Sequence, residues 1–255
     1  MQGRSEELPM GMMWTGMSSF MATEIRVQLH EWFAVVTGSL VQVALLVFVW
    51  VWAPGLLSFA LIGSLSYSMF LVGQRVLNEA AYIRVDHKLN ELYHASPLSP
   101  ESYFLGMSLG ILIAYLPPVI LLFAFLEILH PMNPLSVLAL ILSLLSVWAF
   151  SSALGYSIST RFKDMKTIWP YSSLLTNMFG ILPPVFYPLR YFEASLRTVA
   201  LLIPTSSSVA LVENAAGMAA LTGLEVLTAA ISLALEATAF LAFGIYMARR
   251  TAREA

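Results

Sequence analysis

The sequence contains no cysteine and few charged residues. Without cysteine the chain cannot form disulfides, use a thiol as a nucleophile or bind a metal through thiolates. Charged residues make up 11% of the chain, whereas they make up about 25% of a soluble domain. So few charges cannot cover a water-soluble globule, but lipid solvates apolar surface directly. With 58% hydrophobic residues and a mean hydropathy of +0.77, the composition predicts an integral membrane protein in contact with a lipid bilayer.

Signatures of several function classes are also missing. The net charge is −2 and there is no basic tract, so we expect no nucleic-acid partner. There is no Gly-x-x-x-x-Gly-Lys-Ser/Thr phosphate loop, so this chain cannot bind ATP by that device, and no His-Glu-x-x-His zinc motif. Gly63-Ser64-Leu65-Ser66 is similar to a serine-nucleophile motif, but no histidine lies in an apolar segment to act as its base. We therefore expect no catalytic residue on this chain.

One group of residues has the spacing of metal ligands. His87, Glu91 and His94 stand at i, i+4 and i+7, so on a helix they share a face and could approach a metal ion. Asp86 and Lys88 stand beside them, which is typical of a solvated helix. We favour the solvated helix and expect no metal site and no cofactor on this chain.

Charge-free stretches indicate the spans, because a crossing helix needs about 20 apolar residues. The first such stretch is long enough for two helices, and Ala53-Pro54-Gly55 divides it. We predict an all-α, polytopic membrane protein with one domain, 1–255, and a short re-entrant or interfacial segment between the fifth and sixth spans. The predicted spans are 33–52, 56–76, 102–127, 135–160, 167–189 and 219–247.

The segment 14–32, ahead of the first span, has an amphipathic pattern. Apolar residues recur every three or four positions, whereas charged residues fall elsewhere on the helical wheel. We predict a helix that lies flat in the membrane interface, and the alternative is a short cytosolic helix packed on the bundle. The apolar positions are Trp14, Met17, Met21, Ile25, Leu29 and Trp32.

The distribution of basic residues predicts the orientation. Cytoplasmic loops of membrane proteins carry an excess of Lys and Arg. Of the 13 lysines and arginines, Arg190 and Arg197 alone fall in segments that six spans would place outside. We therefore expect both ends of the chain in the cytoplasm and the protein in the cell membrane.

Ionisable and polar residues inside the spans are candidates for a translocation path, because burying them in lipid is costly. Glu236 lies near the middle of the last predicted span, and Glu225 lies about three turns earlier on the same side. Asn177 is the polar residue in the middle of the fifth span. The alternative is that Glu236 only bonds neighbouring helices and that Glu225 is structural at the outer interface.

Two segments resemble the permeases of type-2 ATP-binding-cassette (ABC) exporters. Segment 89–106 is similar to their cytoplasmic loop, with Glu91, Pro97 and Leu105-Gly106 at the positions of a Glu-x-Leu helix, a proline and a Leu-Gly that enters the third span. Segment 180–188, followed by Pro204-Thr-Ser, resembles the outer stretch before their last span. The segment 80–86 departs from the acidic-basic run that is usual there, and no arginine-rich entry typical of polysaccharide exporters is evident.

The resemblance implies a permease subunit that pairs with a second permease chain, in a homodimer or heterodimer. ATP and Mg²⁺ would bind to a separate nucleotide-binding ATPase subunit. The loop 78–100 would hold a coupling helix that docks on this partner, and a second cytoplasmic loop would add a shorter contact. The partner-binding residues implied are Leu89, Asn90, Glu91, Leu92, Tyr93 and His94 in the first loop, and Arg161, Lys163 and Asp164 in the second.

The sequence indicates the class of substrate less narrowly than the class of protein. A drug-like or lipid-like amphiphile is favoured, because few charges line the spans. A lipid-linked glycan or polysaccharide is the alternative. A stand-alone channel, an assembly factor and an intramembrane hydrolase are the competing functions of other classes.

Overall fold

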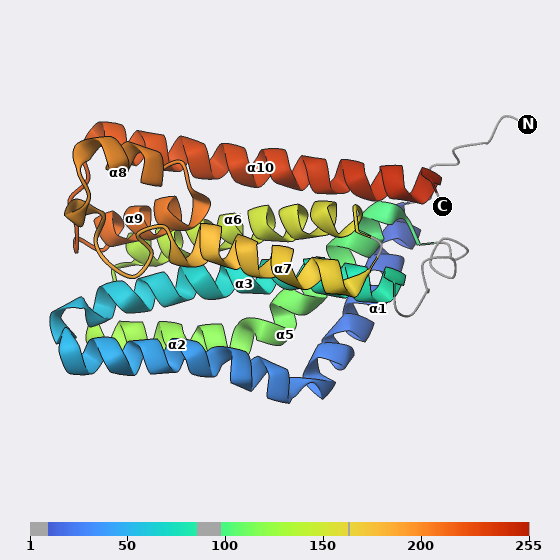
Figure 1. Ribbon diagram of the computed structural model, residues 1–255, viewed down its shortest axis with the longest axis horizontal. Coiled ribbons are helices and arrows are strands. Elements are labelled where there is room, and N and C mark those ends of the chain that lie inside the picture. The colour runs from blue at the N-terminus through green and yellow to red at the C-terminus, as the bar shows by residue number, and fades with distance from the viewer. Residues whose placement is uncertain (1–9, 86–97, 163, 255) are drawn as a thin grey trace, which may run out of the picture.

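The computed structural model describes residues 10–85, 98–162 and 164–254 of the chain (Figure 1). Within these residues every regular element is a helix and there is no strand, as the all-α prediction requires. The elements are α1 (Met10–His30), α2 (Trp32–Trp52), η1 (Pro54–Leu56), α3 (Leu57–Val85), α5 (Pro100–Leu129), α6 (Pro134–Ser159), α7 (Met165–Thr176), the π-helical turn η2 (Asn177–Ile181), η3 (Leu189–Tyr191), α8 (Ala194–Ala200), α9 (Pro204–Ala215) and α10 (Gly223–Glu254).

The long helices α2, α3, α5, α6, α7 and α10 run lengthwise in one bundle (Figure 1). The turns from α2 to α3 and from α5 to α6 lie at the same end as α8 and α9, which we call the α9 end. The opposite end, which we call the α1 end, holds α1, the last turn of α3, the link between α6 and α7, and the last turns of α10.

Helix α3 forms the centre of the bundle. It packs against α2, α5, α6, α7 and α9, and its side chains Leu61, Leu65 and Phe70 are fully buried. Gly73 allows α6 to approach closely, because a Cβ there would overlap Ser151 and the backbone of α6. Small residues at such contacts let helix backbones approach within a membrane, where lipid gives little hydrophobic drive to pack.

Four helical segments among the described residues are long and apolar enough to cross a bilayer: Pro54–Val85, Pro100–Leu129, Pro134–Ser159 and Gly223–Ala252. Helices α8 and α9 meet at an angle of 110° and form either a broken fifth span or a re-entrant loop. The protein is thus a multi-pass membrane protein. Six spans stay a prediction.

The helix positions agree with the predicted spans in three places and differ in three. Helices α2, α5 and α6 begin and end within two residues of 33–52, 102–127 and 135–160. The second predicted span, 56–76, instead continues as α3 to Val85, so the first residues assigned to the cytoplasmic loop are helical. No proline or glycine stands between Arg75 and Val85 to end the helix.

The prediction of a helix over 167–189 was wrong at its outer end. The helical structure stops at Ile181, and residues 182–187 form bends. Pro183 and Pro184 explain the stop, because proline lacks the backbone N–H that an interior helical residue donates. The last predicted span, 219–247, is shifted: α10 begins at Gly223 and continues to Glu254.

Helix α1 packs against α5 by a face that overlaps its apolar stripe only in part, since Met17 and Met21 of the stripe lie at the contact. Phe20, Glu24 and Gln28 are buried, whereas Trp14 and Trp32 of the predicted stripe are exposed. Leu29 of that stripe is exposed as well. The helix therefore packs on the bundle and also presents an apolar surface, and its place in the membrane interface stays a prediction.

Two glycines of α5 make the contact with α1 possible. A Cβ at Gly110 would lie 2.6 Å from Cβ of Glu24, and one at Gly106 would lie 3.0 Å from the carbonyl oxygen of Met17. The Gly106–Gly110 spacing puts both glycines on one face of α5, so α1 lies directly on its backbone.

Candidate functional site

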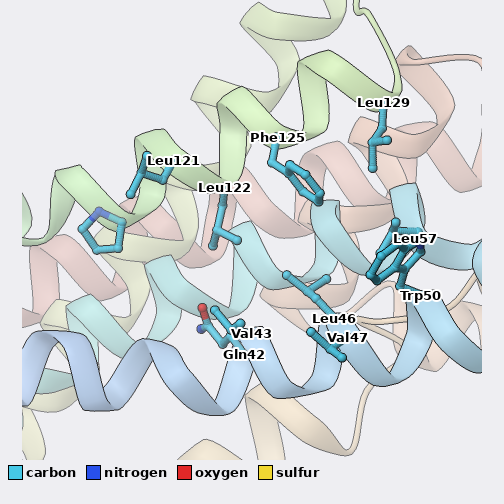
Figure 2. A pocket seen from close by; sticks show the side chains of 11 residues that line it. Gln42, Val43, Leu46, Val47, Trp50, Leu57, Leu121, Leu122, Phe125 and Leu129 are labelled. Atoms are coloured by element: carbon cyan, nitrogen blue, oxygen red, sulfur yellow. The ribbon is translucent and has the colours of Figure 1, made fainter.

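A groove lies between α2 and α5 (Figure 2). Its volume is about 600 Å³, and Leu57 of α3 also lines it. Trp50 and Leu121, on opposite sides, are 63% and 71% exposed, so the groove opens sideways to the surroundings of the bundle. The side chains that define this α2–α5 groove are Val43, Val47 and Trp50 of α2 and Leu121, Phe125 and Leu129 of α5.

A second, polar cavity of about 330 Å³ adjoins the groove. We call it the Arg75 pocket. Gln42 and Pro118 line both the pocket and the groove, so the two lie next to each other. The pocket lies between α2, α3, α5 and α7, and its polar lining residues are Gln42, Ser68, Gln74, Arg75, Asn78, Tyr115, Ser172 and Thr176.

Hydrogen bonds fix the walls of the Arg75 pocket. Nε2 of Gln74 donates to the backbone oxygen of Ser172 and, at 3.1 Å, to its hydroxyl oxygen. The Thr176 hydroxyl donates to Oε1 of Gln74 at 2.8 Å, so both ends of this buried amide hold α7 against α3. The Ser68 hydroxyl donates to Oε1 of Gln42 at 2.9 Å and connects α3 to α2.

Two other polar groups in the pocket lack a hydrogen-bond partner, and Arg75 contacts an aromatic ring. The guanidinium carbon of Arg75 lies 4.8 Å from the centre of the Tyr115 ring, a cation–π contact between α3 and α5. In the described part of the chain no carboxylate pairs with Arg75. The hydroxyl of Tyr115 and Oδ1 of Asn78 are buried and accept or donate no hydrogen bond. Because buried polar groups are nearly always hydrogen-bonded, Tyr115 and Asn78 provide two unsatisfied polar groups in the pocket that Arg75 also lines.

The three residues predicted for the translocation path do not meet in one site. Glu236 lines a separate pocket of about 430 Å³ with Leu202 and Ser232, and its Oε2 is buried without a partner. Glu225 forms a capping box at the start of α10, where Oε2 accepts from the backbone N–H of Thr222 at 2.8 Å. Neither Glu225 nor Asn177 lines the Glu236 pocket.

Asn177 stands where α7 changes into the π-helical turn. Its side chain is exposed, and its backbone oxygen accepts from the N–H of Leu182 at 2.8 Å, which closes the turn. π-helical turns are rare and occur often at functional sites. The structure thus gives Asn177 a place beside an irregular helix end, and its assignment to the translocation path stays a prediction.

Most of the predicted partner-binding residues lie outside the described residues. These are Leu89, Asn90, Glu91, Leu92, Tyr93, His94 and Lys163, together with His87 of the possible metal group. Arg161 and Asp164 are described, and both are exposed in the link between α6 and α7.

Asp164 caps the N-terminus of α7. Its Oδ1 accepts from the backbone N–H of Thr167 at 2.8 Å, and the Thr167 hydroxyl donates to the same carboxylate. These hydrogen bonds lower the pKa of Asp164 below its usual value. The negative carboxylate is therefore fixed at the α1 end of the bundle, where a helix N-terminus favours it.

Arg84 fastens the same link to α3, and the sequence analysis did not select it. Its guanidinium donates to the backbone oxygens of Ser159 and Phe162, at the C-terminus of α6. A basic side chain satisfies the last carbonyls of a helix in this way. The end of α3, which contains the first residues of the predicted loop 78–100, is thus joined to the second predicted contact loop.

A family model described as "ABC-2 family transporter protein" matches residues 21–246 of the chain. The match extends from the middle of α1 into α10, so it includes the candidate spans in α3, α5 and α6 and most of the one in α10. No curated protein and no solved structure matches the chain.

Proposed function

Because the chain belongs to the ABC-2 family of transporter proteins, we propose that it is the permease subunit of an ABC exporter. It would move an amphiphilic substrate outward with energy from ATP that a separate nucleotide-binding subunit hydrolyses. The family match over residues 21–246 is the observation that carries this proposal. A membrane bundle with an apolar groove that opens sideways supports an amphiphile as the cargo.

In the proposed arrangement the α1 end faces the cytoplasm and the α9 end faces outside. The excess of lysine and arginine in the segments of the α1 end supports this orientation. The loop 78–100 and the link that contains Arg161, Lys163 and Asp164 would both reach the ATPase subunit. Two permease chains would pair side by side, and ATP with Mg²⁺ would act on the partner subunits alone.

The hydrogen bonds of Arg84 would couple movement at these ATPase contacts to the helices of the bundle. Arg84 joins the end of α3 to the C-terminus of α6, and Gln74 joins α3 to α7 three turns further along the helix. A displacement of the loops by the ATPase would therefore move α3, α6 and α7 together rather than one loop alone. Rigid elements of this kind transmit small shifts across packed helices.

The direct test is reconstitution. The chain is purified with the ATPase subunit that copurifies with it, placed in liposomes, and assayed for ATP-dependent movement of fluorescent amphiphiles. We expect transport that stops when the phosphate-loop lysine of the partner is replaced. Passage of solutes without ATP would indicate a channel instead, and the absence of any copurifying ATPase would contradict the proposal.

A further inference from the structure

The Arg75 pocket and the α2–α5 groove together have one polar end and one apolar end. Of the described residues that line the pocket, Arg75 alone carries a charge. The groove is lined by aliphatic and aromatic side chains apart from Gln42, which stands at the junction. A molecule that filled both would need a small polar headgroup and a long apolar chain.

The polar end matches an anion that also carries a hydrogen-bond donor. Arg75 and the hydroxyl of Tyr115 can both donate to an acidic oxygen, and charged donors give the stronger hydrogen bonds. Oδ1 of Asn78 is a buried acceptor without a partner, and a hydroxyl group on the ligand would satisfy it. A phosphate ester with a free hydroxyl offers both kinds of group.

The carboxylate nearest to Arg75 along α3 accepts a hydrogen bond from α1. Glu79 stands one turn after Arg75, and its Oε2 accepts from Nε2 of Gln28 on α1 at 3.3 Å. Glu79 does not line the Arg75 pocket. No carboxylate among the described residues lines the Arg75 pocket, where the Arg75 guanidinium contacts the face of the Tyr115 ring.

We propose that the Arg75 pocket and the α2–α5 groove form one binding site for an anionic, lipid-like amphiphile. Its headgroup lies in the pocket between α3, α5 and α7, and its acyl chain lies in the groove between α2 and α5. The cavities have volumes of about 330 and 600 Å³, which is the range of cavities that bind small ligands, about 300–1,000 Å³. The role of this amphiphile as cargo rests on the proposed function, whereas its binding does not.

The depth of Arg75 fits a lipid of the inner leaflet. At 1.5 Å per residue, Arg75 lies about 27 Å along α3 from Leu57, which lines the groove near the α9 end. The hydrocarbon core of a bilayer is about 30 Å thick. With the α9 end outside, Arg75 is close to the level of the inner headgroups, and the groove runs from there toward the outer leaflet. A lipid from the inner leaflet would thus enter sideways with its head already at Arg75.

The binding test uses the permease purified with its ATPase in a neutral maltoside detergent. Fluorescent lysophosphatidylglycerol is the probe, and lysophosphatidylcholine and a cationic amphiphile of the same chain length are the headgroup controls. We expect the anionic probe to bind best. Arg75→Gln should weaken its binding about tenfold or more, weaken that of lysophosphatidylcholine less, and not weaken that of the cationic amphiphile. Arg75→Lys keeps the charge and should retain most of the affinity. This result would show that the loss in Arg75→Gln comes from the missing charge and not from misfolding.

Two further variants complete the binding test: one is a charge control outside the site, and the other blocks the groove. Arg26→Gln removes an exposed arginine of α1 that lines neither cavity, so it is the matched charge control and should not change binding. Val47→Trp fills the groove and should weaken both lysolipids equally. Equal binding of all three headgroups, or unchanged binding in Arg75→Gln, would overturn the site.

The role as cargo is tested in liposomes with the same variants. We expect phosphatidylglycerol to stimulate the ATPase and to move outward with the wild-type complex but not with Arg75→Gln. Binding at Arg75 without stimulation or movement, in a complex that transports another compound, would show a resident lipid and overturn the role as cargo. A complex with no ATP-driven transport of any compound would contradict the proposed function, while the binding test still decides the site.

Discussion

Arg75 of α3 stacks over the ring of Tyr115 of α5, with 4.8 Å between the guanidinium carbon and the ring centre. The contact joins two helices, and both residues line the Arg75 pocket. It holds a cation in place within a multi-pass membrane bundle. The same contact leaves the guanidinium edge available for hydrogen bonds, because the ring covers only its face.

The two parts of the Tyr115 side chain are expected to have opposite effects on stability. Tyr115→Phe removes a buried hydroxyl that has no partner, so the unfolding temperature should stay the same or rise. Tyr115→Leu removes the ring and its contact with Arg75, which should lower the free energy of unfolding by about 0.5–2 kcal/mol. Thermal unfolding followed by tryptophan fluorescence in detergent measures both. Equal losses in the two variants would show that the hydroxyl has a partner in the membrane.

The close packing of α1 on α5 predicts a strong effect at Gly110. Gly110→Ala would place a Cβ 2.6 Å from Cβ of Glu24 and 3.0 Å from the carbonyl oxygen of Met21, so α1 must move away. We expect a lower unfolding temperature and faster proteolysis near Glu31, where α1 meets α2. Gly223→Ala is the matched control, because no atom lies within 4 Å of its added Cβ. Similar behaviour of the two variants would contradict the packing.

The sequence predicted the helices better than their contacts. Charge-free windows located α2, α5 and α6 because length and hydropathy are properties of a segment alone. The end of α3 was missed because its last turns are polar yet pack on neighbours, with Ala81 and Ile83 buried. For α1, periodicity identified a helix but selected its apolar stripe as the buried face, whereas Phe20, Glu24 and Gln28, which lie outside that stripe, are buried.

The polar pocket could be found only in part from the sequence. Gln74, Arg75 and Asn78 stand within about one turn of α3, and this is a signal, because three polar side chains near the end of an apolar helix are costly in lipid. Tyr115 and Thr176 come from α5 and α7, and nothing in their own segments marks them. Only the packing of α3 against both helices brings these groups together.

Glu24 is expected to make stability depend on pH. Burial, reinforced by the charge of Glu79, raises its pKa from 4.5 to about 7 despite the hydrogen bond from Gln28 at 2.9 Å. A carboxyl whose pKa is raised in the folded state favours folding when it is protonated. Its stabilisation is full below pH 4.5 and is lost as the pH rises through about 7.

The change Glu24→Gln mimics the protonated form and should remove this dependence. The unfolding temperature of the wild-type protein in detergent should fall from about pH 4.5, the ordinary pKa, to about pH 7, the raised pKa, and level off above it. That of Glu24→Gln should stay nearly constant over the same range. Asp164→Asn is a suitable control, because Asp164 is exposed and its pKa is lowered, so it does not titrate in this window. A parallel fall in wild type and Glu24→Gln would assign the titration to another group.

Variants of the two acids of α10, Glu225 and Glu236, should distinguish effects on stability from effects on transport. Glu225 caps the helix through Thr222, so Glu225→Ala should lower the free energy of unfolding by about 0.5–2 kcal/mol and leave transport by the surviving protein unchanged.

Glu236 is not part of the helix cap. Its buried Oε2 has no hydrogen-bond partner among the described residues, and Leu202 and Ser232 line the same pocket. If it lies on the translocation path, Glu236→Gln should keep the unfolding temperature and alter the rate of ATP-driven transport or its dependence on pH. A purely structural Glu236 would instead give a silent Gln variant and a Glu236→Leu variant of lower stability. Transport in liposomes from pH 6 to pH 8, with the partner ATPase present, decides between them, and full transport at every pH in Glu236→Gln removes this residue from the path.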